Sequence, residues 1–156
     1  MIKIFNIFSI IILFSIIGCS IFESETTDLE PIEGNILFTI NFDSTEIVPS
    51  HAGFLLLMKT EKIYSCCNFE IKTFMTTNKN TINIKLRGIY FPDICATALG
   101  PARSRIPLNI SNGEYELIFN YEENSDKYIL SIDERNIDVT KVDTSFTVYK
   151  IFNNSF

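Results

Sequence analysis

The chain has 156 residues, a formal net charge of −6 at pH 7 and four cysteines. This length suffices for one domain with a hydrophobic core and a short extension. The net charge is negative and no block of lysine and arginine occurs, which argues against a protein that binds nucleic acid.

The first 18 residues have the form of a secretory signal peptide. Lys3 supplies a positive charge, and residues 4–17 form an apolar segment interrupted only by small or polar single residues. That segment is shorter than the ~20 residues that a membrane-spanning helix requires. The small residue Gly18 follows it, as expected before a cleavage site. We therefore expect residues 1–18 to be a signal peptide.

The residues at the end of this segment carry a more specific signal. Ile16-Ile17-Gly18-Cys19 resembles the lipobox of bacterial lipoproteins, in which an aliphatic residue, a variable residue and Gly or Ala precede a cysteine. The resemblance implies that Cys19 becomes the first mature residue and the lipidation site, with a diacylglycerol on its thiol and a further acyl chain such as palmitate. Two or three acyl chains, at ~0.8 kcal/mol per buried methylene, hold a protein stably on a membrane.

The residue after the cysteine gives a weaker indication of cellular localisation. Ser20 is similar to the residue found in lipoproteins that go to the outer membrane, whereas Asp there tends to retain them in the inner membrane. The resemblance thus implies a lipid-anchored protein of the bacterial cell envelope, at the periplasmic face of the outer membrane or at the cell surface. It covers the first twenty residues and implies nothing about the domain behind them.

Residues 19–33 follow as a polar, acidic segment that contains Pro31 and, after Cys19, five acidic residues without a basic one. Such a composition favours a flexible tether. Residues 34–156 are expected to form a single domain. Most of the negative charge belongs to the tether, so the domain itself is nearly balanced.

From Gly34 onward the sequence alternates with period two, which is typical of half-buried strands. Alternation predicts strands over 36–42, 69–72 and 82–86, with a polar turn at 76–80 between the last two. The continuous apolar run of residues 54–58 predicts a strand that is covered on both faces.

The second half of the chain predicts a series of hairpins. Alternating residues at 106–110 lead into Ser111-Asn112-Gly113, a sequence that tolerates the positive φ of a tight turn. Alternation resumes at 115–121 and at 128–132, on either side of a polar loop, and two shorter strands are expected at 137–139 and 146–148. No stretch shows a sustained helical period. We therefore predict an all-β domain, an antiparallel β-sandwich that is Ig-like in architecture, with a small open β-barrel as the alternative.

Three cysteines remain after Cys19, and an odd number leaves one unpaired within the monomer. An exported protein folds where disulfides are permitted. Neighbouring residues of a strand point to opposite faces, so only one of Cys66 and Cys67 can readily face Cys95. We expect one disulfide between Cys95 and a member of this pair, without a basis for choosing which.

Catalytic and metal-binding patterns are weak throughout the chain. His51 is the only histidine and lies in a predicted loop without a nucleophile motif around it. The acidic residues cluster in two predicted loops, but without the spacing of a calcium site, so we expect solvated loops, no metal and no cofactor. The two groups are Glu122, Glu123 and Asp126, and Asp133, Glu134 and Asp138.

The stretch from Leu99 to Pro107 is the most distinctive predicted loop, because two prolines bracket Arg103 and Arg105. A protruding, stiffened loop of this kind could present an arginine to a trypsin-like protease or contact an anionic ligand. An ordinary connection between strands is the simpler interpretation.

These observations favour a non-catalytic protein over an enzyme. We expect a lipid-anchored binding or adhesion module of the cell envelope, whose ligand is a protein or a polysaccharide and not a nucleic acid. The alternatives are a protease inhibitor that uses the Arg103–Arg105 loop, and a structural subunit of an envelope assembly.

Overall fold

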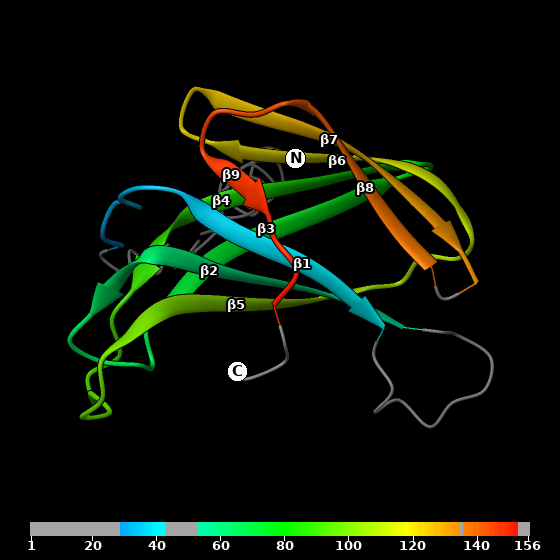
Figure 1. The fold of residues 1–156 in the computed structure, drawn as a ribbon. Helices are drawn as coiled ribbons and strands as arrows, with labels where there is room; N and C mark the ends of the chain where they lie inside the picture. The colour runs from blue at the N-terminus through cyan, green and yellow to red at the C-terminus, as the bar shows by residue number, and fades with distance from the viewer. Residues whose placement is uncertain (1–28, 43–52, 135, 153–156) are drawn as a thin grey trace, which may run out of the picture.

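The computed structural model describes residues 29–42, 53–134 and 136–152, and these residues form strands, turns and loops but no helix (Figure 1). Within this part of the chain no helix could cross a membrane. The strands are β1 (Ile36–Phe42), β2 (Phe54–Tyr64), β3 (Glu70–Asn78), β4 (Thr81–Tyr90), β5 (Gly100–Leu108), β6 (Gly113–Tyr121), β7 (Asn124–Asp133), β8 (Asn136–Asp143) and β9 (Thr147–Tyr149).

All nine strands belong to one sheet, in the order β8-β7-β6-β4-β3-β5-β2-β1-β9. The sheet curls until its two edge strands approach each other, which gives a nearly closed barrel (Figure 1). Three neighbouring pairs are parallel, namely β1–β9, β3–β5 and β4–β6, and the others are antiparallel. The all-β prediction is therefore confirmed. Of the two architectures considered, the open barrel is the one observed, and its sheet is mixed rather than purely antiparallel.

The barrel interior is filled by the inward-facing residues of alternating strands, as period-two patterning requires. Phe38 lies at its centre, with its ring centroid 4.7 Å from that of Phe119 and 4.9 Å from that of Tyr128. Strand β2 is buried on both faces, since outward-facing Leu55 and Leu57 are as inaccessible as its inward residues. The expectation for the apolar run at 54–58 is thus confirmed.

The hairpin predicted across Ser111-Asn112-Gly113 is wrong. Strand β5 lies between β2 and β3, whereas β6 pairs with β4 and β7, so the connection between β5 and β6 carries the chain to another part of the sheet. The turn sequence is satisfied locally instead, because the Tyr115 hydroxyl accepts a hydrogen bond from the Ser111 N–H and donates one to the Ser111 carbonyl, each at 3.2 Å. The predicted hairpin between β6 and β7 is present.

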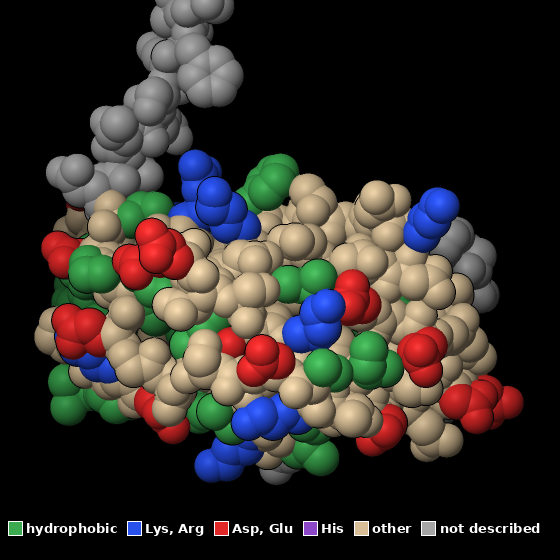
Figure 2. Space-filling view, turned by 90° about the horizontal axis from the view of Figure 1, so that it is seen from above, with side chains coloured by type: hydrophobic (Ala, Val, Ile, Leu, Met, Phe, Trp, Pro, Cys, Tyr) green, Lys and Arg blue, Asp and Glu red, His purple; other side chains and the backbone are tan. Residues whose placement is uncertain are grey.

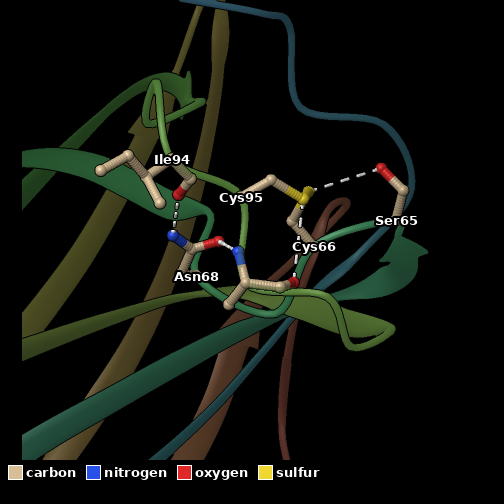
Figure 3. The surroundings of a disulfide bond; sticks show 6 residues. Ser65, Cys66, Asn68, Ile94 and Cys95 are labelled. Carbon is tan, nitrogen blue, oxygen red and sulfur yellow. Dashed lines mark hydrogen bonds between the residues drawn. A yellow bond between two sulfur atoms is a disulfide. The ribbon is translucent and has the colours of Figure 1, made fainter.

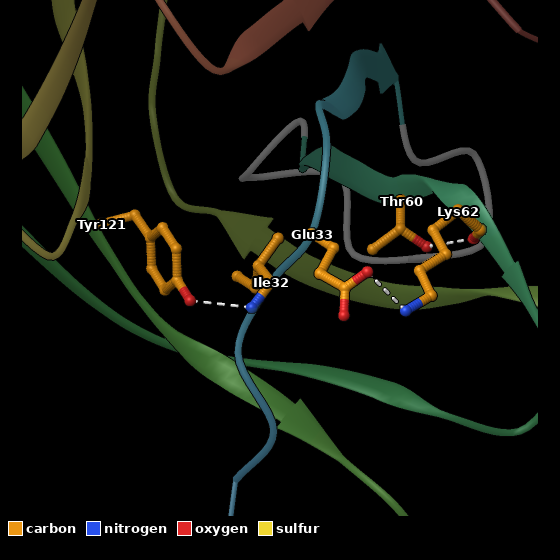
Figure 4. Close-up of polar contacts among 5 residues, drawn as sticks. All are labelled: Ile32, Glu33, Thr60, Lys62 and Tyr121. Carbon is orange, nitrogen blue, oxygen red and sulfur yellow. Dashed lines mark hydrogen bonds and ion pairs between the residues drawn. The ribbon is translucent and has the colours of Figure 1, made fainter.

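Residues 29–33, the end of the predicted tether, lie against the domain (Figure 4). Glu30 and Ile89 exchange two backbone hydrogen bonds of 3.0 and 2.8 Å in an antiparallel bridge. The Ile32 N–H donates to the Tyr121 hydroxyl at 2.7 Å. Gly88, at φ +140°, permits this approach, since a Cβ there would lie 2.8 Å from the Glu30 carbonyl oxygen. The segment therefore continues the sheet beside the last part of β4.

Candidate binding groove between β3 and β5

The sheet is interrupted between β3 and β5. These strands share a single parallel bridge, Glu70 with Arg103, and the Arg103 N–H donates to the Phe69 carbonyl at 3.0 Å. Beyond this point the strands separate, and a groove of about 470 Å³ lies between them. We call it the β3–β5 groove; its lining residues are Cys67, Asn68, Phe69, Glu70, Ile71, Arg103, Ser104 and Arg105.

The sequence of β5 explains why the pairing stops. The Arg103 N–H faces β3, and alternate residues of a strand direct their backbone groups to the same edge. Pro101, Arg105 and Pro107 therefore also face β3, and two of these three residues have no N–H to donate. Prolines of a sheet are found where their missing donor faces an open edge. They leave β5 paired with β2, apart from a register break opposite Lys59–Ile63, and with only the N–H groups of Arg103 and Arg105 facing β3.

The edge of β3 that faces the groove has no such protection. Beyond Ile71 this strand pairs with β4 alone among the described residues, so no described strand pairs with the backbone groups on its other edge. Unpaired N–H and C=O groups along a strand are a ready template for another extended chain. The outward-facing Phe74 on the same strand is 60% exposed.

Arg103 and Arg105 lie on this groove, but not on a loop. The prediction of a protruding loop over residues 99–107 is wrong, because residues 100–108 form β5, in the interior of the sheet. Arg103 is half-buried and Arg105 is exposed. The prolines suggested a loop, yet three of the four alternate residues from 102 to 108 are apolar and buried, with Ser104 the exception, which was the signal for a strand: Ala102, Ile106 and Leu108.

Positive charge dominates the groove. It contains the guanidinium groups of Arg103 and Arg105 and one carboxylate, Glu70, which already forms an ion pair with Lys72 at 2.5 Å. The Lys72 ammonium also lies 4.5 Å from the centroid of the Tyr90 ring. Guanidinium groups bind carboxylates with two parallel hydrogen bonds where geometry allows. The groove is therefore suited to a ligand that carries carboxylates.

Cys67 lines the groove, next to the disulfide that Figure 3 shows. Cys66 forms a disulfide with Cys95, with 5.4 Å between their Cα atoms, and Cys67 is a free thiol on the groove wall. The prediction of one bridge to Cys95 is confirmed, and Cys66 is the partner. Gly100 is required beside them, because a Cβ at this position would lie 2.8 Å from the Cβ of Cys67.

The acidic clusters give one correction. Asp126 was expected in a solvated loop, but it lies on β7 with no exposed surface and accepts five hydrogen bonds from residues 145–147. The sequence contained an indication of this burial. Asp126 precedes Tyr128 by two residues, so in a strand both side chains face the interior. The other acidic residues of the two clusters are exposed, as expected. Glu122, Glu123 and Glu134 lie between strands, whereas Asp133 ends β7 and Asp138 lies on β8 rather than in a loop.

The described residues contain no group of three or more His, Cys, Asp or Glu side chains that could hold a metal ion. Cys19 and His51 lie outside the described residues. The lining of the groove supplies hydrogen-bond donors, positive charge and open backbone edges, and these are features of a binding site. No protein family, no curated protein and no solved structure matches the chain.

Proposed function

We propose that this chain is a lipid-anchored protein of the bacterial cell envelope, at the outer membrane, that acts as a non-catalytic binding module. The lipobox-like residues 16–19 support the proposed localisation. The β3–β5 groove supports the activity, and the observation that carries it is an open β3 edge beside two arginines. Its ligand is an extended segment of a partner protein that carries acidic side chains.

The mode of binding follows from the backbone. An extended peptide that pairs with the free edge of β3 gains main-chain hydrogen bonds, as in other cases of strand addition, and these bonds are independent of its sequence. Selectivity then comes from side chains on alternate positions, where a carboxylate meets the exposed Arg105. An anionic polysaccharide could meet the same arginines but could not continue the sheet.

A photo-crosslinking experiment tests the groove. With p-benzoylphenylalanine at Ser104, which lines the groove, we expect a crosslinked partner in intact cells. The same probe at Thr140, exposed on β8, is the matched control and should give none. Arg105→Glu should remove the crosslink at position 104, since losing a charge-assisted contact costs about 2 kcal/mol, or more than tenfold in affinity. A crosslink that persists in Arg105→Glu would refute the proposed site.

A second substitution separates a peptide from a polysaccharide. Thr73 lies two residues beyond Ile71 on β3, and its backbone N–H faces the same edge as the Phe69 carbonyl. Thr73→Pro removes this edge donor and leaves the edge toward β4 unchanged. The crosslink at position 104 should be lost for a peptide ligand and kept for a polysaccharide.

The lipid anchor has its own test. In cells grown with radiolabelled palmitate, we expect label on the wild-type protein. We also expect this protein to partition into the detergent phase of a Triton X-114 extraction. Cys19→Ser should lose the label, because the resemblance assigns the acyl chains to this cysteine. Cys67→Ser, which removes the free thiol of the domain, should keep it. Label on Cys19→Ser would contradict the anchor.

A further inference from the structure

Large apolar side chains are exposed at one end of the barrel. This end, where β2 and β4 finish and β3 and β5 begin, is called the loop end here because it carries the loop of residues 91–99. Figure 2, seen from above, shows hydrophobic side chains at the left-hand end of the molecule and also over the middle of this face. The exposed fractions at the loop end are 83% for Ile94, 78% for Leu99, 57% for Ile63 and 38% for Phe91.

The loop that carries most of these side chains is held in place. The disulfide joins Cys95 to Cys66 at the end of β2, and Asn68 bonds both the Ile94 carbonyl at 2.7 Å and the Ala96 N–H at 3.1 Å (Figure 3). The Phe91 ring lies 4.1 Å, centroid to centroid, from that of Phe69. A loop with these restraints cannot fold its apolar side chains back into the core, so they stay at the surface.

The N-terminal segment leaves the described domain at the same end. The bridge of Glu30 to Ile89 is antiparallel, so Leu29 lies toward the C-terminal end of β4, where the loop begins. Leu29 is ten residue steps from Cys19, with nine residues between them, and this stretch spans at most about 35 Å when fully extended. A lipid at Cys19 would therefore keep the loop end close to the bilayer.

We infer that the loop end docks on the lipid bilayer, with Ile94 and Leu99 inserted at the boundary between headgroups and acyl chains. The inference rests on the proposed lipid anchor and adds an orientation to it. Apolar side chains exposed on a rigid loop are costly in water and are stabilised at this boundary. Strand β3 starts at the loop end and runs away from it, so its free edge rises from the membrane and stays accessible from the side.

The chain contains no tryptophan, so a single introduced one reports on its own surroundings. We would prepare Ile94→Trp and Leu99→Trp as acylated proteins from cell membranes and reconstitute each into phosphatidylethanolamine–phosphatidylglycerol vesicles. Thr77→Trp, at an exposed position near the other end of β3, is the matched control. Vesicle flotation measures attachment, and quenching by lipids with brominated acyl chains measures insertion.

We expect all three proteins to float, with emission at positions 94 and 99 shifted to shorter wavelength and quenched by brominated lipid, and position 77 unaffected. Flotation with unquenched emission at 94 and 99 would overturn the docking and leave the anchor intact. Absence of flotation would overturn the anchor and the docking together. Emission at 94 and 99 that is unquenched in vesicles but shielded from acrylamide in native envelopes would overturn membrane docking in favour of a protein partner.

Discussion

Asp126→Asn should lower the free energy of unfolding by about 3 kcal/mol, and the midpoint of thermal unfolding by roughly 10 °C. Asp126 is a buried carboxylate whose two oxygens are both saturated. Oδ1 accepts bonds from the N–H and the hydroxyl of Ser145, at 2.7 and 2.9 Å. Oδ2 accepts bonds from the N–H groups of Phe146 and Thr147, at 3.0 and 2.6 Å, and from the Thr147 hydroxyl at 2.5 Å.

An asparagine of the same shape cannot replace these contacts. Its single carbonyl oxygen can accept on one side only, and its amide group then directs hydrogens at backbone donors that cannot turn away. Serine and threonine hydroxyls can reorient to accept, but a backbone N–H cannot. At least one N–H loses its partner and the charge that strengthened the remaining bonds is gone.

The effect is large because these bonds join the edge strand β9 to β7, the strand next to the opposite edge of the sheet. Asp126 and Tyr128 lie on β7 and Thr147 on β9, at the opposite end of the strand order, and the Tyr128 hydroxyl donates to the Thr147 carbonyl at 2.8 Å. Strand β9 has only a three-residue parallel pairing with β1 as its other backbone contact in the sheet. Side-chain bonds therefore hold the barrel closed where no strand pairing does.

The acid dependence of stability identifies the carboxylate as the cause. Burial raises the pKa of Asp126, but the hydrogen bonds from the Thr147 hydroxyl and from the backbone of residues 145–147 outweigh it and hold the pKa below its ordinary value. A carboxylate with a lowered pKa stabilises the fold above its unfolded pKa, about 3.9. This contribution is lost as the pH falls through the folded pKa. The stability gap between wild type and Asp126→Asn should thus be constant near neutral pH and shrink below about pH 4.

Asp133→Asn is the matched control, since Asp133 is exposed on the same strand, and its effect should stay within about 0.5 kcal/mol. Urea unfolding gives the free energies. Hydrogen exchange of the 145–147 amides in Asp126→Asn locates the change. Faster exchange of these amides than of those in β2 would show that the contact between β7 and β9, called the seam here, has opened. Equal stability of Asp126→Asn and wild type would show that the seam is held by other contacts.

Local pattern predicted the strands well, because burial on one face of a sheet imposes period two on the sequence. The alternation over 36–42 and the apolar run at 54–58 gave β1 and the start of β2. Cysteine counting, joined to the opposite orientation of neighbouring residues in a strand, gave one bridge to Cys95. The strand inferences need only residues close together in the chain, and the disulfide inference needs only the number of cysteines and the adjacency of Cys66 and Cys67.

The predictions that failed depend on which strands become neighbours. An Asn-Gly turn signal describes four residues, and it cannot show that β5 is already enclosed by β2 and β3. The prolines of β5 indicate a loop unless one knows that they face an open edge. Asp126 has the sequence context of a solvated acid, because the residues that bury it and bond to it lie about 20 positions further along the chain. The β3–β5 groove was missed for the same reason, since it is the absence of a pairing between distant strands.

The barrel is therefore secured at the places where strand pairing fails. Side-chain bonds of Asp126 close the seam between β7 and β9, and the disulfide stands at the end of the interruption between β3 and β5. The covalent link joins the connection between β2 and β3 to the loop between β4 and β5, directly beside Cys67 on the groove wall. The proposed groove and the proposed membrane contact thus depend on the same bond.

Removing this disulfide with Cys66→Ala/Cys95→Ala should lower the free energy of unfolding by about 3.5 kcal/mol. Cys66 and Cys95 are 29 residues apart, and a crosslink that closes a loop of this length restricts the unfolded chain by about that amount. The double substitution prevents Cys67 from taking over the bridge to Cys95. Urea unfolding under non-reducing conditions measures the loss, and reduced wild type should unfold at the same midpoint as the double variant.

Cys67→Ala is the matched control, because it removes a half-buried thiol from the adjacent position and keeps the bridge. We expect it to unfold within about 1 kcal/mol of wild type and to respond to reductant as wild type does. In the double variant the tryptophan at position 94 should also lose most of its quenching by brominated lipid, since the loop is no longer held outward. A double variant as stable as wild type would mean that the hydrogen bonds of Asn68 are sufficient to hold the loop end, and that the disulfide contributes to neither stability nor docking.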